Sequence, residues 1–484
     1  MIGQGSIGRR HAAIVVALGH DATSYDPAPA GETPAGVETA ASLEEALERA
    51  DAAVIASPSS VHAAQARQAI DRGVPVLVEK PLTTDAARAA ELEWLARERG
   101  VLLAVAMNLR HHPGVRALRE LLAQDAVGRV LRAAAWCGSW LPGWRPGTDY
   151  RTSYSASARL GGGVLLDVAI HELDYLLWLL GPAAAVTAVS RHVSSLGLDD
   201  VDDVAIIALE LRSGAVAHVT VDYFDRSYHR GCRIVGGRAT AHWSWERERV
   251  TVRGGEPGAE TSHERAVPAD VAPAYRRQME RFLGAISGAG GAPGAGGSVD
   301  GVVGAREARE VLAVIDAVAS SSRQGRRVAI APQVELRAAV DSDSGRLLAW
   351  RNDPDTRRWS RSQDEVSAQE HQRWLERVLS DPGVLQWIAE ADGVSVGQIR
   401  LTREPPDAAE LHVTVAPEAR GRGLGTELIV EAAARGLADT TVHRLIAHVK
   451  SDNEPSCRAF ARAGFELQGG DETGLLRLER QRCG

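Results

Sequence analysis

Three residues, Lys80, Asp167 and His171, have the side-chain types needed to move a proton during a hydride transfer. Asp167 and His171 are four residues apart, so on a helix they share one face. A histidine can take the proton of a hydroxyl group that gives up hydride, and a lysine can stabilise the alkoxide. Lys80 and Lys450 are the only lysines in an arginine-rich chain, so Lys80 stands out as a cation that can share a proton. The set predicts oxidation of an alcohol or the reverse reduction.

Each of these residues also has a simpler interpretation. Lys80 follows Glu79 and can form an ordinary ion pair, and Asp167 with His171 can be a structural helix contact. The segment His171-Glu172-Leu173-Asp174 lacks the second histidine of an HExxH motif, so we expect no metal site.

A dinucleotide loop opens the chain. Gly3, Gly5 and Gly8 form GxGxxG, and Ser6 and Ile7 begin a helical pattern. Such glycines let a pyrophosphate approach a helix N-terminus, whose dipole favours negative charge. Asp26 ends the next predicted strand at the distance expected of a ribose-binding acid, and no arginine follows it directly. The pattern predicts NAD as cofactor, in preference to NADP.

The elements around this loop alternate between strands and helices, which is typical of a doubly wound parallel sheet. Only Met1 and Ile2 precede the loop, so we expect most of the first strand to be missing. We predict strands at 22–25, 52–56, 75–78 and 102–106 and helices at 43–49, 62–72 and 85–99. Longer alternating runs at 204–211 and 215–223 predict a largely antiparallel sheet. Residues 287–304, mostly Gly and Ala, predict a flexible excursion, and a helix follows at 305–321.

Four segments within residues 1–330 resemble the Gfo/Idh/MocA oxidoreductase family. They are Ala56-Ser57-Pro58…His62, Glu79-Lys80-Pro81, Asn108-Leu109-Arg110…Pro113 and the stretch from Gly161 to Asp174. The resemblance implies an α/β fold, with a Rossmann dinucleotide-binding domain at 1–118 and an α+β antiparallel-sheet substrate domain at 119–330. It also implies catalytic roles for Lys80, Asp167 and His171. We assign Ser57, Pro58, His62 and Glu79 to the cofactor site.

An aromatic and basic stretch supplies candidates for substrate binding. Aromatic faces and forked guanidinium groups suit a sugar ring and a phosphate or carboxylate, although a packing cluster explains the pattern equally well. With the motif arginine they are Arg110, Trp144, Arg145, Tyr150 and Arg151. The stretch resembles family members that act on sugars, often nucleotide-linked.

A second glycine-rich loop lies in the last third of the chain. Here a strand containing Val413 and Val415 runs into Arg420-Gly421-Arg422-Gly423-Leu424-Gly425, and Asn453 starts a later helix. Amides at such a helix N-terminus can hold the pyrophosphate of acetyl-CoA. The loop and the following helix resemble the GNAT acetyltransferases, which implies a GNAT α/β domain over 333–484. We assign these residues to binding of acetyl-CoA.

Acetyl transfer to an amine needs a proton acceptor and a way to protonate the leaving thiolate. Glu410 is our candidate base, with His412 as the alternative. The GNAT family often places a tyrosine as general acid where this chain has Phe460. We therefore leave the identity of the acid open.

Composition narrows the classes of partner. The 484 residues carry a net charge of −8, which gives no field for nucleic acid or an anionic membrane, and no apolar run is long enough to cross a bilayer. The four cysteines show no CxxC spacing and are typical of free thiols in a reducing compartment. We therefore expect a cytoplasmic protein, a homo-oligomer, that acts on a small-molecule sugar or nucleotide sugar.

The pairing of the two domains predicts a bifunctional enzyme of amino-sugar biosynthesis. One domain oxidises a sugar hydroxyl, a separate aminotransferase converts the ketone to an amine, and the other domain acetylates that amine. Three alternatives remain open: a ketosugar reductase, an acetyltransferase of a protein N-terminus or an antibiotic, and an inactive nucleotide-binding module that regulates the transferase.

Overall fold

The computed structural model describes residues 1–28, 32–256, 258–287, 301–391, 393–404, 406–439, 441–471 and 474–482. They form two compact units, one of residues 1–89 and 96–330 and the other of residues 90–95 and 331–484. Each unit is described by itself. The centre of the predicted flexible excursion, 288–300, and Cys483 lie outside the described residues.

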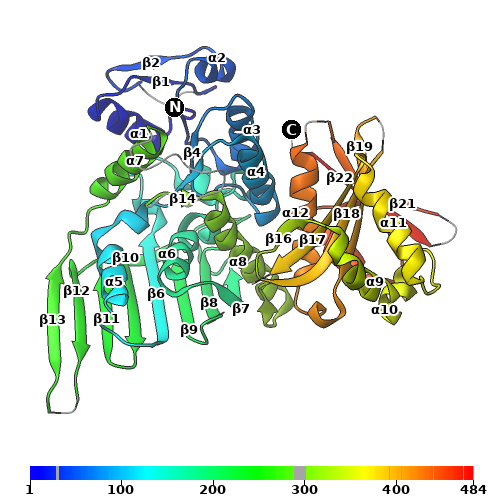
Figure 1. Cartoon of the computed structure of the whole chain (residues 1–484). Coiled ribbons are helices and arrows are strands. Elements are labelled where there is room, and N and C mark those ends of the chain that lie inside the picture. Colours follow the sequence, from blue (N-terminus) through cyan, green and yellow to red (C-terminus); the bar gives the residue numbers. More distant parts are fainter. Residues whose placement is uncertain are drawn as a thin grey trace. The chain divides into compact units, whose positions relative to one another are not determined.

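The first unit begins with a parallel sheet flanked by helices (Figure 1). Every side chain of its central strands β3, β4 and β5 is buried, which is why these segments are continuous apolar runs. The strands are β1 (Ala22–Ser24), β2 (Val37–Thr39), β3 (Ala53–Ile55), β4 (Val76–Glu79), β5 (Leu103–Ala106) and the antiparallel edge strand β14 (Val303–Gly304). The helices are α1 (Ser6–Ala17), α2 (Leu43–Glu48), α3 (His62–Asp71) and α4 (Ala86–Arg99). The predicted Rossmann arrangement is confirmed.

Ile2 occupies the place of the first strand. Its backbone bridges Ile55 on one side and Tyr25 on the other, and its N–H donates to the carbonyl of Val54 at 2.8 Å. The link between β1 and β3 therefore consists of Met1 and Ile2. As expected from the sequence, this part of the sheet is short.

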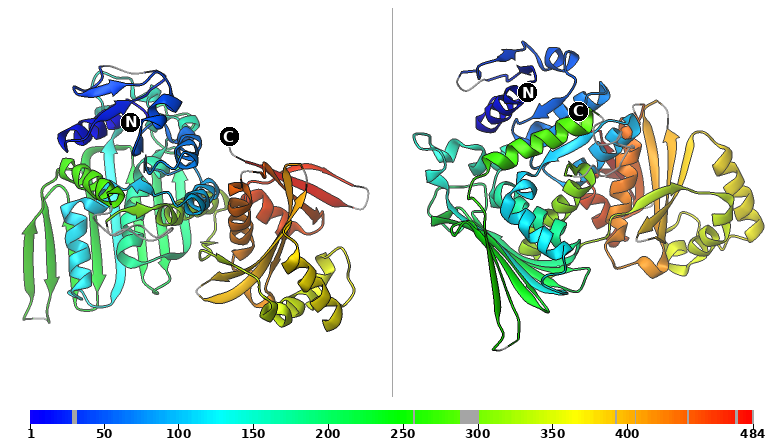
Figure 2. Two further views of the ribbon diagram at one scale, coloured as in Figure 1. Left: turned by 45° about the horizontal axis from the view of Figure 1, so that its top comes forward. Right: turned by 60° about the vertical axis from the view of Figure 1, so that its left-hand side comes forward.

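The second part of this unit is a nine-stranded sheet in the order β13-β12-β11-β10-β6-β9-β8-β7-β15, antiparallel except for the β6–β9 pair. Its strands are β6 (Val130–Trp140), β7 (Ala183–Arg191), β8 (Val204–Leu211), β9 (Val216–Asp222), β10 (Phe224–Gly236), β11 (Ala239–Ser244), β12 (Arg249–Gly254), β13 (Thr261–Ala266) and β15 (Val328–Ala329). Helices α5 (Pro113–Ala123), α6 (Ile170–Leu180) and α8 (Ala305–Gln324) pack on one face of it, and α7 (Ala272–Ile286) packs against α1 (Figures 1 and 2). Side chains along β8 alternate between buried and exposed because helices cover only one face.

The turn before α6 is wider than a turn of regular α-helix. Residues Leu165–Ala169 form a single π-helical turn that runs directly into α6. Gly161 and Gly163, just before it, have φ values of 87° and 96°, which residues other than glycine rarely adopt. Asp167 therefore lies in a wider turn than His171, which belongs to the regular helix α6.

The second unit contains a seven-stranded sheet in the order β16-β17-β18-β19-β20-β22-β21. Helix α12 (Leu424–Ala438) covers one face together with α13 (Glu454–Arg462), and α9 (Ser344–Asn352), α10 (Pro354–Trp359) and α11 (Ala368–Ser380) lie on the other (Figure 1). The strands are β16 (Glu335–Ala338), β17 (Val384–Ala391), β18 (Val394–Glu404), β19 (Ala408–Val415), β20 (Arg444–Lys450), β21 (Glu466–Gly470) and β22 (Leu475–Gln481).

The neighbours β19 and β20 form the parallel pair of this sheet. Their pairing ends at Glu410 and Ile446, although both strands continue beyond these residues. The two strands therefore separate in the middle of the sheet. The ends of β19 and β20 carry Val415 and Lys450, respectively.

Candidate functional sites

The glycine loop has the shape that a pyrophosphate needs. Gly3 has φ of 93°, and a Cβ on Gly8 would lie 2.0 Å from the Gly3 carbonyl oxygen, so both positions require glycine. A Cβ on Gly5 would meet nothing within 4 Å, which leaves the approach to α1 open. Gly5 caps α1 without a side-chain hydrogen bond, and the next residue, Ser6, is exposed while Ile7 is half-buried. This first turn can accept an anion.

Asp26 lies beyond the end of β1, beside this loop. Its carboxylate accepts hydrogen bonds from the backbone N–H of Gln4 at 2.6 Å and of Ala28 at 2.9 Å. These two amides hold the carboxylate at the edge of the glycine loop, where the sequence placed a ribose-binding acid.

His62 is buried and has no nitrogen directed at a cofactor. Its Nδ1 lies 2.8 Å from the carbonyl of Pro81 and its Nε2 lies 2.9 Å from the carbonyl of Ser57. Burial lowers the pKa of His62, so the neutral ring donates to one of these carbonyls. The ring ties the Ser57-Pro58 loop to the segment after Lys80, and the assignment of His62 to the cofactor site stays a prediction.

Glu79 is engaged in a similar way. Its Oε1 lies 2.7 Å from Nε2 of His11, a buried residue of α1, and its Oε2 accepts from the backbone N–H of Lys80 at 3.1 Å. Glu79 therefore joins the cofactor helix to the end of β4. Sequence reasoning missed His11 because nothing in the local pattern links it to a residue 68 positions away.

Lys80 and Asp167 meet although 87 positions separate them. The Lys80 Nζ donates to Asp167 Oδ1 at 2.7 Å and to the Asp167 carbonyl at 2.8 Å, and the two side chains are 15% and 11% exposed. Burial alone would lower the pKa of Lys80, but the Asp167 carboxylate raises it above its usual value. Burial alone would raise the pKa of Asp167, but Lys80 lowers it. Both groups are therefore charged at neutral pH.

Two hydroxyl groups complete the surroundings of Asp167. Its Oδ2 accepts from Ser155 Oγ at 2.6 Å and from the Tyr223 hydroxyl at 3.2 Å. Burial raises the pKa of Tyr223 well above its usual value, so the phenol keeps its proton and donates it. Ser155 and Tyr223 hold the carboxylate in position for Lys80, and neither stood out in the sequence.

His171 lies at the start of α6, within the field of the same charges. Burial, followed by the positive charges of Lys80 and Arg230, lowers the pKa of His171 well below its usual value. Its Nδ1 is buried and has no hydrogen-bond partner among the residues that the structure describes. The imidazole is therefore neutral at physiological pH.

Arg110 was predicted to bind substrate, and in the structure its guanidinium group contacts carboxylates of the protein. Its Nε and Nη2 donate to the Asp174 carboxylate at 2.7–3.1 Å, and its Nη1 lies 2.5 Å from Glu307 Oε1. Arg110 is 8% and Asp174 1% exposed at the side chain. All three guanidinium nitrogens contact protein carboxylates, so Arg110 joins the segment after β5 to α6 and α8.

The other predicted substrate residues lie on the segment between β6 and the π turn. Trp144 is 40% exposed and packs edge-on against Tyr223, whose hydroxyl contacts Asp167. The Tyr150 hydroxyl donates to the Leu196 carbonyl, and Arg151 is paired with Asp149. Arg145 is exposed. Trp144 is therefore the member of this set that the structure connects most closely to the Lys80–Asp167 pair.

The loop of the second unit is built around two glycines with positive φ. Gly421 and Gly423 have φ of 74° and 79°, and α12 starts at Leu424 without a side-chain cap. Arg420 does not point its charge at a free anion site, because its Nη2 lies 2.5 Å from Asp353 Oδ1 and 2.8 Å from Thr356 Oγ1. The guanidinium of Arg420 therefore anchors the loop, and binding of acetyl-CoA by this residue stays a prediction.

The remaining predicted acetyl-CoA residues lie on β19, in this loop, at the start of α12 and at the start of α13. Val413 and Val415 are half-buried on β19, Arg422 is exposed, and a Cβ on Gly425 would make an ordinary contact with Val415. Asn453 caps α13 by accepting from the backbone N–H of Ser456 at 3.2 Å. Phe460 is buried edge-on against Phe465. A phenylalanine has no proton to give, so this position supplies no general acid.

Glu410 lies where β19 and β20 separate, inside a ring of basic side chains. Its Oε1 is 2.7 Å from Arg361 Nη2 and 2.9 Å from His448 Nδ1, and its Oε2 is 3.2 Å from His412 Nε2. The hydrogen bonds of His412 and His448 and the charge of Arg361 lower the pKa of Glu410 to about 2, against the effect of burial. So weak a base is poorly suited to take a proton at neutral pH.

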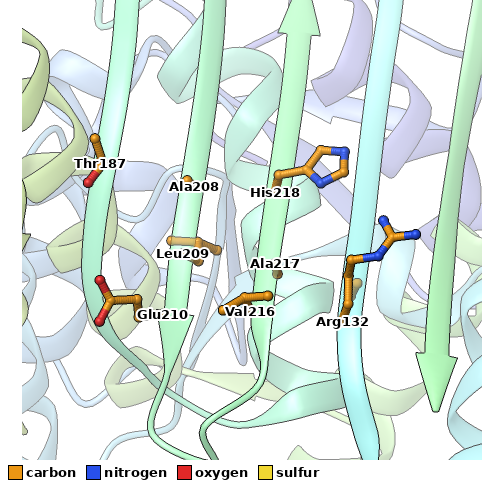
Figure 3. A pocket seen from close by; sticks show the side chains of 9 residues that line it. Arg132, Thr187, Ala208, Leu209, Glu210, Val216, Ala217 and His218 are labelled. Atoms are coloured by element: carbon orange, nitrogen blue, oxygen red, sulfur yellow. The ribbon is translucent and has the colours of Figure 1, made fainter. Parts of the chain in front are cut away.

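A shallow hollow on the nine-stranded sheet is not part of either site. It is lined by residues of β6–β9, among them Arg132, Glu210 and His218, and Figure 3 shows these side chains on neighbouring strands. None of the predicted site residues lines it. Among the described residues, no helix is long and apolar enough to span a membrane, and no cluster of His, Cys, Asp and Glu has the arrangement of a metal site.

Comparison with known families assigns both halves of the chain. Residues 1–107 match the oxidoreductase family with an NAD-binding Rossmann fold, and residues 115–242 match the GFO/IDH/MocA C-terminal domain. Residues 333–466 match the acetyltransferase (GNAT) domain.

Individual relatives agree with the first assignment. Inositol 2-dehydrogenase 4 of Saccharopolyspora erythraea is 30% identical over 300 residues, which are 58% of this chain and 80% of that protein. UDP-N-acetylglucosamine 3-dehydrogenase of Acidithiobacillus ferrooxidans is 29% identical over 295 residues, which are 59% of this chain and 88% of that protein.

A solved structure has the same fold. GenD2 from gentamicin A biosynthesis, in complex with NAD, superposes with a TM-score of 0.56 at 25% identity and covers 68% of this chain and 94% of its own. The chain belongs to the Gfo/Idh/MocA family of NAD(P)-dependent oxidoreductases, and its last third is a GNAT acetyltransferase domain.

Proposed function

We propose that this chain catalyses two steps of amino-sugar biosynthesis. The first unit oxidises a hydroxyl of a sugar, preferably a nucleotide-linked one, to a ketone with NAD+. The second transfers the acetyl group of acetyl-CoA to the amine of an amino sugar. The substrate class is supported by the similarity to a dehydrogenase named for UDP-N-acetylglucosamine. A separate aminotransferase would supply the amine between the two steps.

The observation that carries the oxidation step is the buried Lys80–Asp167 pair at the end of β4. Asp167 keeps Lys80 protonated, and the ammonium can donate a hydrogen bond to the hydroxyl oxygen that becomes an alkoxide. His171, neutral at physiological pH, accepts the hydroxyl proton. Trp144, exposed beside Tyr223, offers a face for the sugar ring.

The residues of the first unit fit a dinucleotide. The open approach at Gly5, the uncapped start of α1 and the carboxylate of Asp26 can bind a pyrophosphate and a ribose. The bound nicotinamide supplies the acceptor for the hydride. His62 and Glu79 support this site indirectly, by joining the Ser57 loop and α1 to the residues around Lys80.

The test is to incubate the protein with NAD+ and UDP-linked sugars and to follow NADH formation by absorbance and the ketone by mass spectrometry. A second reaction supplies acetyl-CoA and UDP-linked amino sugars and follows release of the thiol. NADH formation from a nucleotide sugar and acetylation of the matching amine support the proposal. Acetylation without any NADH formation would favour the regulatory-module alternative instead.

The reverse reaction is the second candidate for the first unit. The same Lys80 and His171 act as hydrogen-bond donor and acid when a ketosugar is reduced, so the residues are compatible with both directions. Oxidation of added NADH by a ketosugar, faster than the forward reaction under matched conditions, would assign the physiological role to reduction.

Self-association of the chain also stays a prediction. Light scattering of the purified chain measures its molar mass and so tests this prediction.

Substitutions in the glycine loop are expected to separate cofactor binding from folding. In Gly5→Ala the new methyl group meets no protein atom, so thermal stability should stay unchanged, while the Kd of NADH rises by about tenfold or more because the pyrophosphate is displaced. In Gly8→Ala the methyl group collides with the Gly3 carbonyl, so both properties should deteriorate. Fluorescence titration and thermal unfolding measure the two effects. Equal NADH affinity in Gly5→Ala and the wild type would contradict this placement of the pyrophosphate.

Asp26 is expected to determine the choice between NAD and NADP. Replacement by serine removes a carboxylate that repels the extra phosphate of NADP, so Asp26→Ser should lower the preference for NAD by about tenfold or more. The ratio of kcat/KM for the two cofactors measures this preference. An unchanged ratio would show that the ribose does not approach Asp26.

A further inference from the structure

The surroundings of Glu410 place two imidazoles next to a carboxylate that is 12% exposed. His448 lies on β20 and His412 on β19, each two residues beyond the last paired residues, Ile446 and Glu410. Both imidazoles therefore lie where the two strands have separated. His448 is 25% exposed, so a small molecule can reach it.

The two rings are held by different nitrogens. His448 uses Nδ1 toward Glu410 Oε1 at 2.9 Å, which leaves Nε2, the nitrogen far from the backbone, available. His412 uses Nε2 toward Glu410 Oε2 at the longer distance of 3.2 Å, which leaves only Nδ1, close to its own backbone. A carboxylate that receives Nδ1–H fixes the tautomer with a lone pair on Nε2. Of the two rings, His448 is the one arranged to take a proton from an incoming amine.

We propose that His448 is the general base of acetyl transfer and that Glu410 is a positioning residue that orients its ring. This inference rests on the proposed acetylation of an amine, and it replaces Glu410 as the group that accepts the proton. The low pKa of Glu410 agrees with this division, because a carboxylate that stays ionised can stabilise the imidazolium that forms.

The step balances without further reagents than acetyl-CoA and the amine. His448 Nε2 takes one proton from the ammonium form of the acceptor, and the free amine attacks the thioester carbonyl carbon. The C–N bond forms, the C–S bond breaks, and the CoA thiolate leaves with the second proton of the amine nitrogen. The imidazolium then returns its proton to solvent.

Several charged groups face His448. Arg361 follows α10 in the chain, and its side chain is 65% exposed. Its Nη2 lies 3.4 Å from Nδ1 of His448 and also contacts the carboxylate of Glu410. From β19 the facing groups are Glu410 and His412, and from β22 Arg477 pairs with His448 in register and is itself bound to Glu479. We therefore use the wild-type pH profile, measured alongside, as the reference for each variant.

The test compares His448→Gln, His412→Gln and the control His443→Gln in the whole chain. His443 is an exposed histidine directly before β20, the strand that carries His448. With a UDP-linked amino sugar as acceptor, His448→Gln should lower kcat by about 100-fold and leave the KM of acetyl-CoA unchanged. Its fall of kcat/KM at acid pH should move to the pKa of the acceptor amine itself, because only the free amine then reacts. His412→Gln should change kcat by less than about tenfold and keep the wild-type fall, and His443→Gln should behave as the wild type.

A second acceptor distinguishes loss of a base from loss of structure. Trifluoroethylamine is already neutral at physiological pH and needs no base, so its acetylation should be nearly equal in His448→Gln and the wild type. Glu410→Gln should reduce kcat with the UDP-linked amine and shift the acid limb of the profile, because the ring loses its orientation and counter-charge. An unchanged acid limb in His448→Gln, or a shift of that limb to the pKa of the amine in His412→Gln, would overturn the proposal.

The substrate proposal can fail independently. If the wild type acetylates other small amines but no amino sugar, the proposed acceptor is wrong, and the same histidine comparison is made with the amine that reacts. An acid limb that moves to the pKa of the acceptor amine only in His448→Gln still supports the base. Equal pH profiles in the two proteins overturn it.

Discussion

Lys80→Met is expected to lower kcat for NADH formation by about 100- to 1000-fold while acetyl transfer by the same chain stays at the wild-type rate. Lys80 Nζ is the charged donor beside the predicted position of the reacting oxygen, and a donor aimed at developing negative charge contributes about this much to catalysis. Methionine keeps the length of the side chain and removes the charge. Steady-state assays of both reactions on one preparation measure the two effects.

The other lysine of the sequence provides a matched control. Lys450 lies at the end of β20 in the second unit and donates to the carbonyl of Arg358, so Lys450→Met should leave NADH formation unchanged. Lys80→Met also leaves Asp167 without its counter-charge, and the double variant Lys80→Met/Asp167→Asn removes that defect. The double variant should recover stability but not oxidation. Loss of both activities in Lys80→Met would show that the two sites are not independent.

The parts of the molecule that the sequence predicted are those set by local pattern. Buried parallel strands such as β4 and β5 are mostly apolar runs between helices. The spacing of the glycines between Gly3 and Gly8 is required by few structures other than this loop. The side-chain types of Lys80 and Asp167 also predicted groups that take part in proton transfer. The distance between them in the sequence, 87 residues, could be bridged only through a family resemblance.

The missed residues share a different property. Tyr223, Arg361 and His448 lie 56, 49 and 38 positions from the carboxylates they contact. Each belongs to another strand or segment, so no spacing along the chain points to it. The π turn at Asp167 was hidden for a related reason, because an α-helix and a π turn carry the same apolar residues and differ by one residue in hydrogen-bond register.

Arg110 shows how composition misleads at buried positions. An arginine near a motif asparagine suits an anionic substrate, and the sequence offers no sign that Asp174 and Glu307 already bind it. Buried guanidinium groups need carboxylate partners to offset their desolvation, so an arginine in such a place is a structural element first. We therefore expect Arg110, which joins three segments, to contribute to the free energy of unfolding of the first unit.

Arg110→Met is expected to destabilise the first unit by about 3–5 kcal/mol, because it leaves the 1%-exposed Asp174 carboxylate without a partner. Trp178, whose ring lies 5.6 Å from the Arg110 guanidinium, offers a fluorescence signal for the denaturant midpoint. Arg119→Met is the control: Arg119 is exposed and lies over the same ring at 4.2 Å, so its loss should cost less than about 1 kcal/mol.

A second variant tests whether the unpaired carboxylate is the cause. Arg110→Met/Asp174→Leu replaces the ion pair with apolar groups, and it should recover most of the lost stability because neither buried charge remains. Glu307, 35% exposed at the side chain, stays hydrated in both variants. If Arg110→Met instead kept the wild-type midpoint and raised the KM of the sugar, Arg110 would be a substrate ligand after all, and its contacts with Asp174 and Glu307 would have to open when the sugar binds.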